Sequence, residues 1–225
     1  MDAIRKLHNG AKRSLITKYV PRGAKVLDVG CGQGGDVLKW RSRDAILTMC
    51  DPNAPPLEEA RRRAEAQDMN VRITVGDILG APKEVFDIIC FNFSLQYIFA
   101  DIDYLYKCMI EISRRAHRGT LLIGCIPDSE FIIRNPNYSD KLGNVVKRNK
   151  LYTGFGNVSE KVDVMLVDTP YYNGKCIPEP IAYKDVFITW MENNGWFMKE
   201  WSPLLDQPMG TISDMYSKFC FLRLS

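Results

Sequence analysis

One stretch decides the fold: Val26-Leu27-Asp28-Val29-Gly30-Cys31-Gly32-Gln33-Gly34-Gly35-Asp36. It contains, in order, a short aliphatic strand, a glycine-rich turn and the start of a helix. Glycine has no Cβ, so this turn can bend sharply and its backbone can approach a ligand closely. The glycine spacing alone does not name the ligand, because dinucleotide-binding proteins carry a related turn. Asp36 narrows the choice, because a carboxylate in the first helical turn repels a phosphate and attracts a cationic sulfonium or amine.

The segments around this stretch alternate between short aliphatic strands and charged helices. Strands are expected at 25–29, 46–50, 71–75, 86–91 and 120–125. Helices are expected at 1–19, 34–43, 57–67 and 103–115. This alternation predicts an α/β fold with a mainly parallel sheet and helices on both faces. Such sheets bind ligands beyond the carboxyl ends of their strands.

The regular alternation ends after Cys125. A region rich in proline, asparagine, glycine and tyrosine follows, and then a predicted helix at 183–193 and strands at 196–201 and 218–224. We interpret the chain as a single domain over 1–225, with a leading helix in 1–20 and a substrate-side insertion of long loops at 127–182. Long loops over the carboxyl edge of a sheet usually carry function.

Composition excludes several kinds of protein and site. The 225 residues are 46% hydrophobic and carry a net charge of +3, too mild for a protein that holds many phosphates at once. Seven cysteines without a C-x-x-C pair are typical of reduced thiols, and two histidines argue against a metal site. No apolar stretch reaches the roughly 20 residues that cross a bilayer. We expect no metal, no membrane partner and a cytoplasmic protein, with a nuclear location left open.

Two further aspartates follow at the ends of predicted strands. Asp51 stands where a carboxylate can accept hydrogen bonds from both hydroxyls of a ribose. Asp77 can accept a hydrogen bond from an adenine amino group, with Ile78 against the ring. With the glycine turn, these residues resemble the class I methyltransferase family, whose cofactor is S-adenosylmethionine. The resemblance implies a Rossmann-like, mainly parallel sheet of seven strands with an antiparallel last strand, for which 218–222 is suitable.

A more specific resemblance, to the mRNA cap (guanine-N7) methyltransferases, begins in the same loop. The family's Leu-Asp-Leu-Gly-Cys-Gly-Lys-Gly-Gly-Asp-Leu-x-Lys-Trp is matched by 27–40, with Gln33 in place of the lysine. The family's leading helix carries Asn-x-x-Lys-x-x-Leu-Ile, matched by Asn9, Lys12, Leu15 and Ile16. The resemblance implies that Lys12 contacts the methionine carboxylate of the cofactor, and that His8 and Asn9 face the cap.

The family's Gln-Phe-x-x-His-Tyr corresponds to 92–97, where Asn92 replaces the glutamine and Gln96 replaces the histidine. Tyr97 and the backbone around Asn92 and Ser94 would border the cofactor sulfonium and the guanine. An amide can still hydrogen-bond to a purine, so Gln96 is kept as a guanine contact.

Two later segments complete the resemblance. The stretch 177–183 resembles the family's Pro-Glu-x-x-Val-Tyr, in which the glutamate recognises guanine, and 214–217 resembles its carboxyl-terminal tyrosine segment. Glu179 could accept from both the N1–H and the amino group of guanine, a pair of donors that adenine lacks. Tyr216 would close the guanine pocket.

The resemblance implies two sets of positioning residues and no general base, because N7 of guanine has a free lone pair. The cofactor set is Lys12, Gly30, Gly32, Asp36, Asp51, Asp77, Ile78, Asn92, Ser94 and Tyr97. The cap set is His8, Asn9, Gln96, Tyr97, Glu179 and Tyr216. Basic residues expected near the cap triphosphate are Lys12, Arg13, Lys18, Lys39, Arg41 and Arg43. The runs 61–63 and 147–150 are interpreted as solvated.

The implied function is methyl transfer from S-adenosylmethionine to guanine N7 of the GpppN cap of mRNA. The implied partners are the capped mRNA 5′ end and the guanylyltransferase and triphosphatase domains or subunits of capping. Two alternatives stay open: a methyltransferase of another RNA or small molecule, and an inactive methyltransferase-like subunit that binds RNA or a partner. The short chain also suits a domain of a large DNA virus capping enzyme, located in a viral factory or virion.

Overall fold

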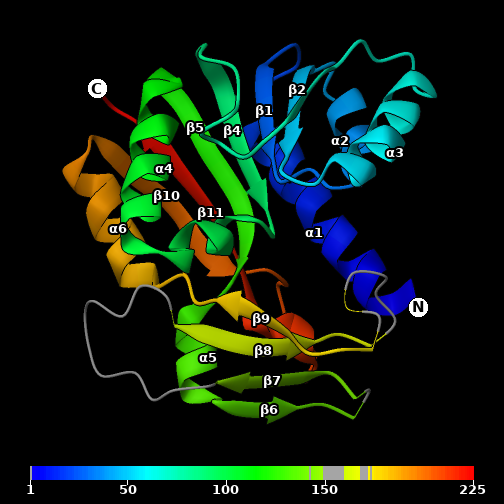
Figure 1. Ribbon diagram of the computed structural model, residues 1–225, viewed down its shortest axis with the longest axis vertical. Helices are drawn as coiled ribbons and strands as arrows, with labels where there is room; N and C mark the ends of the chain where they lie inside the picture. The colour runs from blue at the N-terminus through cyan, green and yellow to red at the C-terminus, as the bar shows by residue number, and fades with distance from the viewer. Residues whose placement is uncertain (1, 142, 149–159, 168–171, 173) are drawn as a thin grey trace.

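A sheet of seven strands forms the centre of the protein (Figure 1). The computed structural model describes residues 2–141, 143–148, 160–167, 172 and 174–225. The strand order across the sheet is β10-β11-β5-β4-β1-β2-β3. The strands are β1 (Lys25–Val29), β2 (Ile46–Asp51), β3 (Arg72–Val75), β4 (Phe86–Asn92), β5 (Ala116–Pro127), β10 (Trp196–Pro203) and β11 (Tyr216–Arg223).

Strand β11 is the antiparallel member of this sheet. The strands β1 to β5 pair with one another in parallel. In contrast, β11 pairs antiparallel with both β5 and β10. Val26 and Leu27, in the central strand β1, are fully buried, as expected for a parallel strand covered on both faces. The predicted mainly parallel sheet of seven strands with an antiparallel last strand is therefore confirmed.

Helices cover both faces of the large sheet, and successive strand residues pack against opposite layers. On one face lie α1 (Asp2–Tyr19), α2 (Val37–Arg41) and α3 (Ala54–Glu65), which bury residues such as Ile16 and Trp40. On the other lie α4 (Ile102–Arg114) and α6 (Lys184–Asn193), which bury Met109 and Phe187. In Figure 1, α4 and α6 lie side by side in front of β5, β10 and β11.

The helix after the glycine turn is shorter than the predicted 34–43. Its first residue is Val37, because Gly32 and Gly34 have φ of +51° and +69° and form turns that delay the helix. The helix α4 begins close to its predicted start, where the Asp101 carboxylate accepts a hydrogen bond from the Tyr104 N–H.

A second sheet occupies much of the region interpreted as long loops, so that interpretation is wrong for these residues. Its antiparallel strands are β6 (Asn137–Ser139), β7 (Val145–Arg148), β8 (Lys161–Met165) and β9 (Ile177–Pro180), and α5 (Ser129–Arg134) precedes them. Val162 and Val164 are buried at alternate positions of β8, a strand signal within a turn-rich composition. Residues 142, 149–159, 168–171 and 173 of the predicted insertion lie outside the described residues.

The second sheet lies beyond the carboxyl ends of the parallel strands, beside the amino-terminal half of α1 (Figure 1). Two short 3₁₀ helices, η1 (Leu95–Ala100) and η2 (Ile212–Met215), follow β4 and precede β11. Of the seven cysteines, five are buried, Cys31 is half-buried and Cys176 is exposed, and all are free thiols. In the described part of the chain, no helix combines the length and apolar character needed to cross a membrane.

Candidate functional site

A cavity of about 1020 Å³ lies at the carboxyl ends of the parallel strands, between α1, η1 and the second sheet. Most of the predicted site residues line it, and these are His8, Asn9, Lys12, Gly30, Gly32, Asp51, Asp77, Ile78, Ser94, Gln96, Tyr97, Glu179 and Tyr216. Two predicted cofactor residues, Asp36 and Asn92, are not among the lining residues. The fold thus gathers residues from distant parts of the sequence around one space.

The glycine turn forms the floor of one end of the cavity. Gly30 has φ of +73°, and a Cβ placed on it would lie 2.4 Å from the Cβ of Ser94. Ser94 itself is fixed by a hydrogen bond of 2.6 Å from its Oγ to the Val29 carbonyl. A Cβ on Gly32, in contrast, would meet no atom within 4 Å, so its backbone borders open space. The turn therefore requires glycine at position 30 for packing and offers bare backbone to a ligand at position 32.

The Asp51 and Asp77 carboxylates are held by backbone N–H groups at the strand ends. The two oxygens of Asp51 accept separate hydrogen bonds, one from the Gly32 N–H at 2.8 Å and one from the Asn53 N–H at 2.9 Å. Asp77 accepts from the Leu79 N–H at 2.8 Å and from the Tyr104 hydroxyl. A carboxylate oxygen has two lone pairs, so each aspartate keeps acceptor capacity for a ligand.

Asp36 is the centre of a buried charge cluster behind the cavity wall. One of its oxygens lies 2.7 Å from the Lys12 Nζ and 2.6 Å from the Lys39 Nζ, and the other accepts from the Asn92 amide at 2.9 Å. Lys39 also donates to the Asn9 side chain at 2.9 Å. The sequence predicted that the Asp36 carboxylate attracts a cationic ligand. In the structure this carboxylate instead pairs with two ammonium groups of the chain, and Lys12 lies between Asp36 and the cavity.

The pKa values of this cluster follow from burial and charge. Burial alone would raise the pKa of Asp36, but the Lys12 and Lys39 ammonium groups outweigh it and the pKa falls below its usual range. Burial raises the pKa of the neighbouring Asp28 carboxyl, and the charge of Asp36 raises it further. Asp28 accepts a hydrogen bond of 2.9 Å from the Trp40 indole N–H, which links the cluster to the core.

Three rings form an aromatic cluster at the other end of the cavity. The ring centroids of His8, Phe93 and Tyr216 lie 5.0 to 5.3 Å from one another. The His8 Nε2 lies 3.0 Å from the Ser213 Oγ, which fixes the imidazole. Phe93 has φ of +62°, which is uncommon for a residue with a side chain and places its ring on the cavity wall. Such a cluster offers flat apolar surfaces to a planar ligand.

The imidazole of His8 should make the stability of the protein depend on pH. Burial, together with the smaller effect of the Lys12 ammonium charge, lowers its pKa to about 4. As the pH falls, the imidazole is protonated in the unfolded chain before it is protonated in the folded protein. The stability present above pH 6.5 is therefore lost as the pH falls towards 4. The imidazole contributes a slope of at most about 1.4 kcal/mol per pH unit to the free energy of unfolding. In urea denaturation, the variant His8→Asn should therefore show a smaller decrease of this free energy with falling pH. An equal slope in both proteins would contradict the assignment.

Glu179 and Gln96 form a buried polar pair beside the aromatic cluster. The Gln96 Nε2 donates to the Glu179 Oε2 at 3.2 Å, and the Tyr172 hydroxyl donates to the Glu179 Oε1 at 2.5 Å. Tyr97 is a further hydrogen-bond donor to the same carboxylate. Glu179 is 3% exposed, and this burial raises the pKa of its carboxyl.

The basic residues at the cavity differ from those expected. Arg5 and Arg63 line it together with Lys12, although the run at 61–63 was interpreted as solvated. Lys39 is buried against Asp36. The other expected basic residues do not line the cavity. Three of them contact the protein elsewhere: Lys18 donates to Glu200, Arg41 to the Gln67 carbonyl and Arg43 to the Val20 carbonyl. The run at 147–150 extends beyond the described residues.

Several lining residues were not predicted from the sequence. Phe93 lies within the motif at 92–97, but the sequence suggested no role for it. Tyr104, Asn144 and Tyr172 belong to no sequence motif that would indicate a functional site. Their position depends on the packing of α4 and of the second sheet, which sequence patterns do not determine. Within the described residues, no group of three or more His, Cys, Asp or Glu side chains could hold a metal ion.

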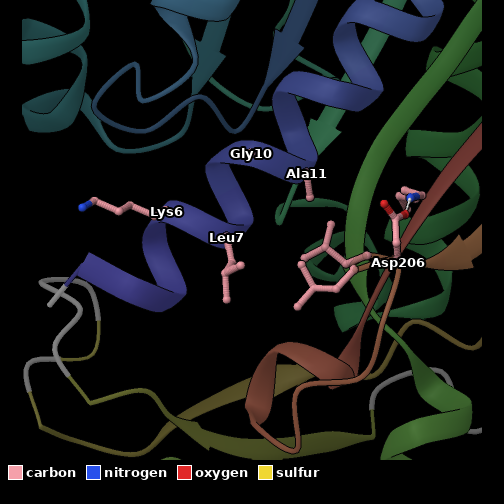
Figure 2. Close-up of a pocket in the computed structure, with 8 residues that line it drawn as sticks. Lys6, Leu7, Gly10, Ala11 and Asp206 are labelled. Carbon is pink, nitrogen blue, oxygen red and sulfur yellow. Dashed lines mark hydrogen bonds and ion pairs between the residues drawn. The ribbon is translucent and has the colours of Figure 1, made fainter.

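A second, smaller hollow of about 350 Å³ lies between α1 and the segment after β10. Figure 2 shows Leu7 and Ala11 on the side of α1 that faces Asp206, while Lys6 extends away from it. Leu204 and Leu205 complete an apolar floor, and the nearby ion pair joins Asp206 to Lys218. Among the described residues that line this hollow, there is no buried polar group without a partner and no cluster of reactive side chains. The larger cavity is therefore the candidate active site.

Several known methyltransferases are similar to this chain in sequence or in fold. A curated mRNA cap guanine-N(7) methyltransferase of Candida glabrata is 27% identical over 84% of this chain and 47% of its own length. The Saccharomyces cerevisiae protein of the same name is 28% identical over 66% of this chain and 40% of its own length. The chain thus spans less than half of either relative. The crystal structure of an S-adenosylmethionine-dependent methyltransferase from Clostridium acetobutylicum has the same fold, with a TM-score of 0.67 and 14% identity over the whole chain and 94% of that protein.

A family model matches more than two thirds of the chain. The model described as the mRNA (guanine-N(7))-methyltransferase domain matches residues 2–161, which run from α1 through the glycine turn, Asp51, Asp77 and the aromatic Phe93 into the second sheet. The match therefore includes the end of the cavity that contains the glycine turn and part of its aromatic end. This chain belongs to the mRNA (guanine-N(7))-methyltransferase domain family.

Proposed function

We propose that this chain transfers the methyl group of S-adenosylmethionine to N7 of the guanine in the GpppN cap of mRNA. The observation that carries the proposal is the buried Glu179 carboxylate, which lies beside the aromatic cluster of the cavity. The glycine turn lines the other end of the same cavity. A buried carboxylate beside flat apolar rings suits a base with N–H donors on one edge, which describes guanine and not adenine.

The other end of the cavity fits the nucleoside and methionine parts of the cofactor. Asp51 has one acceptor site free on each oxygen, which matches the two hydroxyls of a ribose. The cavity wall beside Asp77 includes Ile78, an apolar surface for an adenine ring. Lys12 lines the cavity with an ammonium group that suits the methionine carboxylate. Burial alone would lower the pKa of this ammonium group, but the charge and hydrogen bond of Asp36 outweigh burial and raise it, so the group stays charged. When bound, the cofactor supplies a methyl group already activated by its sulfonium.

The residues of this chain act by positioning, because guanine N7 has a free lone pair and loses no proton in the reaction. Orientation of two reactants at attack distance can supply roughly 7 to 11 kcal/mol of the barrier. Glu179 would fix the edge of guanine opposite N7, while Phe93 and Tyr216 restrict its plane. The reaction leaves a positive charge on guanine, which the Glu179 carboxylate stabilises. Arg5 and Arg63 line the same cavity and suit the triphosphate bridge.

Methyl transfer to defined caps tests the proposed function. Labelled S-adenosylmethionine should transfer its methyl group to GpppA and not to ApppA, since adenine presents no N1–H to Glu179. Absence of transfer to GpppA, also in the presence of guanylyltransferase and triphosphatase subunits, would refute the proposal. We propose that such capping activities, on a longer polypeptide or on separate subunits, produce the GpppN substrate.

Asp51→Ala should weaken cofactor binding without abolishing the fold. The change removes the predicted ribose acceptor and also the anchor of the Gly32 N–H. A hydrogen bond to a charged group contributes about 1.5 to 3 kcal/mol, so the Kd for S-adenosylhomocysteine should rise at least about 10-fold. Calorimetric titration measures this. The exposed Asp103, outside the cavity, provides the matched control Asp103→Ala, and equal affinities for both variants would contradict the ribose assignment.

A further inference from the structure

The Gln96 side chain leaves one buried acceptor without a partner. Gln96 lines the cavity and is only 3% exposed, and its Oε1 has no hydrogen-bond partner among the described residues. A buried polar atom without a partner costs free energy, and such atoms are rare in folded proteins. At a cavity wall, an orphan acceptor indicates a missing donor from a ligand.

The orientation of the Gln96 amide is determined by its neighbours. Its Nε2 lies 3.2 Å from the Phe93 carbonyl oxygen and 3.2 Å from the Glu179 Oε2. Both neighbours are acceptors, so the nitrogen must face them and the oxygen must face elsewhere. The torsion that carries the amide is soft, so a small rotation can bring Oε1 to a donor in the cavity.

Glu179 has little acceptor capacity left for a second ligand donor. A carboxylate offers about four lone-pair sites. Three donors of the chain already use this carboxylate, namely the Tyr172 hydroxyl, the Gln96 amide and the Tyr97 side chain. One site therefore remains, whereas guanine brings an N1–H and an exocyclic amino group on the same edge.

We propose that the two residues divide the guanine edge: Glu179 accepts from the N1–H, and the Gln96 Oε1 accepts from the exocyclic amino group. This inference rests on the proposed function and refines it, because it makes Gln96 the residue that discriminates guanine from a base without the amino group. The pairing replaces the expectation that Glu179 alone accepts from both donors.

The inosine cap, IpppA, tests this division because hypoxanthine keeps the N1–H and lacks the amino group. The wild-type protein should methylate IpppA with a kcat/KM roughly 10- to 100-fold below that for GpppA, since the Gln96 acceptor stays unpaired. The variant Gln96→Met keeps the length of the side chain and removes the acceptor. Its kcat/KM values for the two caps should agree to within about twofold, the usual scatter of independent effects.

Two controls accompany this comparison. The exposed Gln207→Met, outside the cavity, should keep the wild-type ratio of GpppA to IpppA. Titration with S-adenosylhomocysteine should show that Gln96→Met is folded and binds cofactor, because Gln96 contacts the guanine end.

Different outcomes separate the inference from the function on which it rests. Equal kcat/KM of the wild-type protein for GpppA and IpppA, or an unchanged ratio in Gln96→Met, would overturn the inference alone. Absence of transfer from the wild-type protein to GpppA would refute the proposed function and the inference with it.

Discussion

Glu179→Ala is expected to lower kcat/KM for GpppA by roughly 30- to 1000-fold, which corresponds to about 2 to 4 kcal/mol of lost recognition. The variant removes the acceptor for the guanine N1–H. It also leaves the Tyr172 hydroxyl and the Gln96 Nε2 without the carboxylate that they share. Because the buried carboxylate also stabilises the positive charge that forms on guanine, both kcat and KM should change. Initial rates of methyl transfer over a range of GpppA concentrations measure the two constants.

The variant Glu179→Gln separates charge from shape. It keeps the volume of the side chain but presents an NH₂ group to neighbouring donors, so its loss of activity should approach that of Glu179→Ala. Affinity for S-adenosylhomocysteine should stay within about twofold of wild type in both variants, because effects at separate sites usually add to within that factor. Glu130 is an exposed carboxylate on α5, and Glu130→Ala is the matched control. Full cap activity in Glu179→Ala would remove this residue from the guanine site.

The residues at the end of the cavity that we assign to the cofactor could be located from the sequence because they follow the strands directly. Gly30, Gly32, Asp51 and Asp77 each come at or after the carboxyl end of a parallel strand, and these ends meet at one edge of the sheet. The hydrophobic runs that identify the strands thereby also fix the positions of the residues after them. The parallel pairing of β1 with β2 and of β2 with β3 then brings the two aspartates to the same side of the cavity.

The guanine end depends on contacts that sequence patterns do not encode. The resemblance to a family located Glu179 and Tyr216, but the partner Tyr172 comes from a turn before β9 and has no motif of its own. The second sheet was missed because its strands are short and its region is rich in turn-forming residues. The alternation of Val162 and Val164 was its visible sign, and it is too short to be decisive alone.

Asp36 shows how tertiary contacts change the role expected of a residue from its place in the sequence. Its position at the start of a helix suggested attraction for a cationic ligand. In the fold, α1 brings the Lys12 ammonium to 2.7 Å from its carboxylate, and the next helical turn brings Lys39 to 2.6 Å. Charges that lie 24 residues apart in the sequence, as Lys12 and Asp36 do, meet only because α1 packs over α2. We infer that Asp36 positions Lys12 for the cofactor carboxylate.

This role predicts a large effect of Asp36→Asn on stability. The substitution keeps the shape of the side chain and leaves two largely buried ammonium groups with less compensating charge, which should lower the free energy of unfolding by about 3 kcal/mol. Removal of the Asp36 charge lowers the pKa of Asp28 and allows this carboxyl to ionise. Because the ionised Asp28 partly compensates the two ammonium groups, the loss of stability should be smaller than for two wholly unpaired charges. Equilibrium denaturation in urea at neutral pH measures the change.

The surface provides a matched control for this buried cluster. Asp44 also contacts two cations, Arg22 at 2.6 Å and Arg41 at 3.5 Å, but its side chain is 46% exposed. Asp44→Asn should therefore cost less than about 1 kcal/mol. The double variant Asp36→Asn/Lys39→Met removes one of the uncompensated charges and should recover part of the lost stability. Similar losses of unfolding free energy in Asp36→Asn and Asp44→Asn would show that burial does not strengthen the cluster. Such a result would contradict the inference that Asp36 positions Lys12.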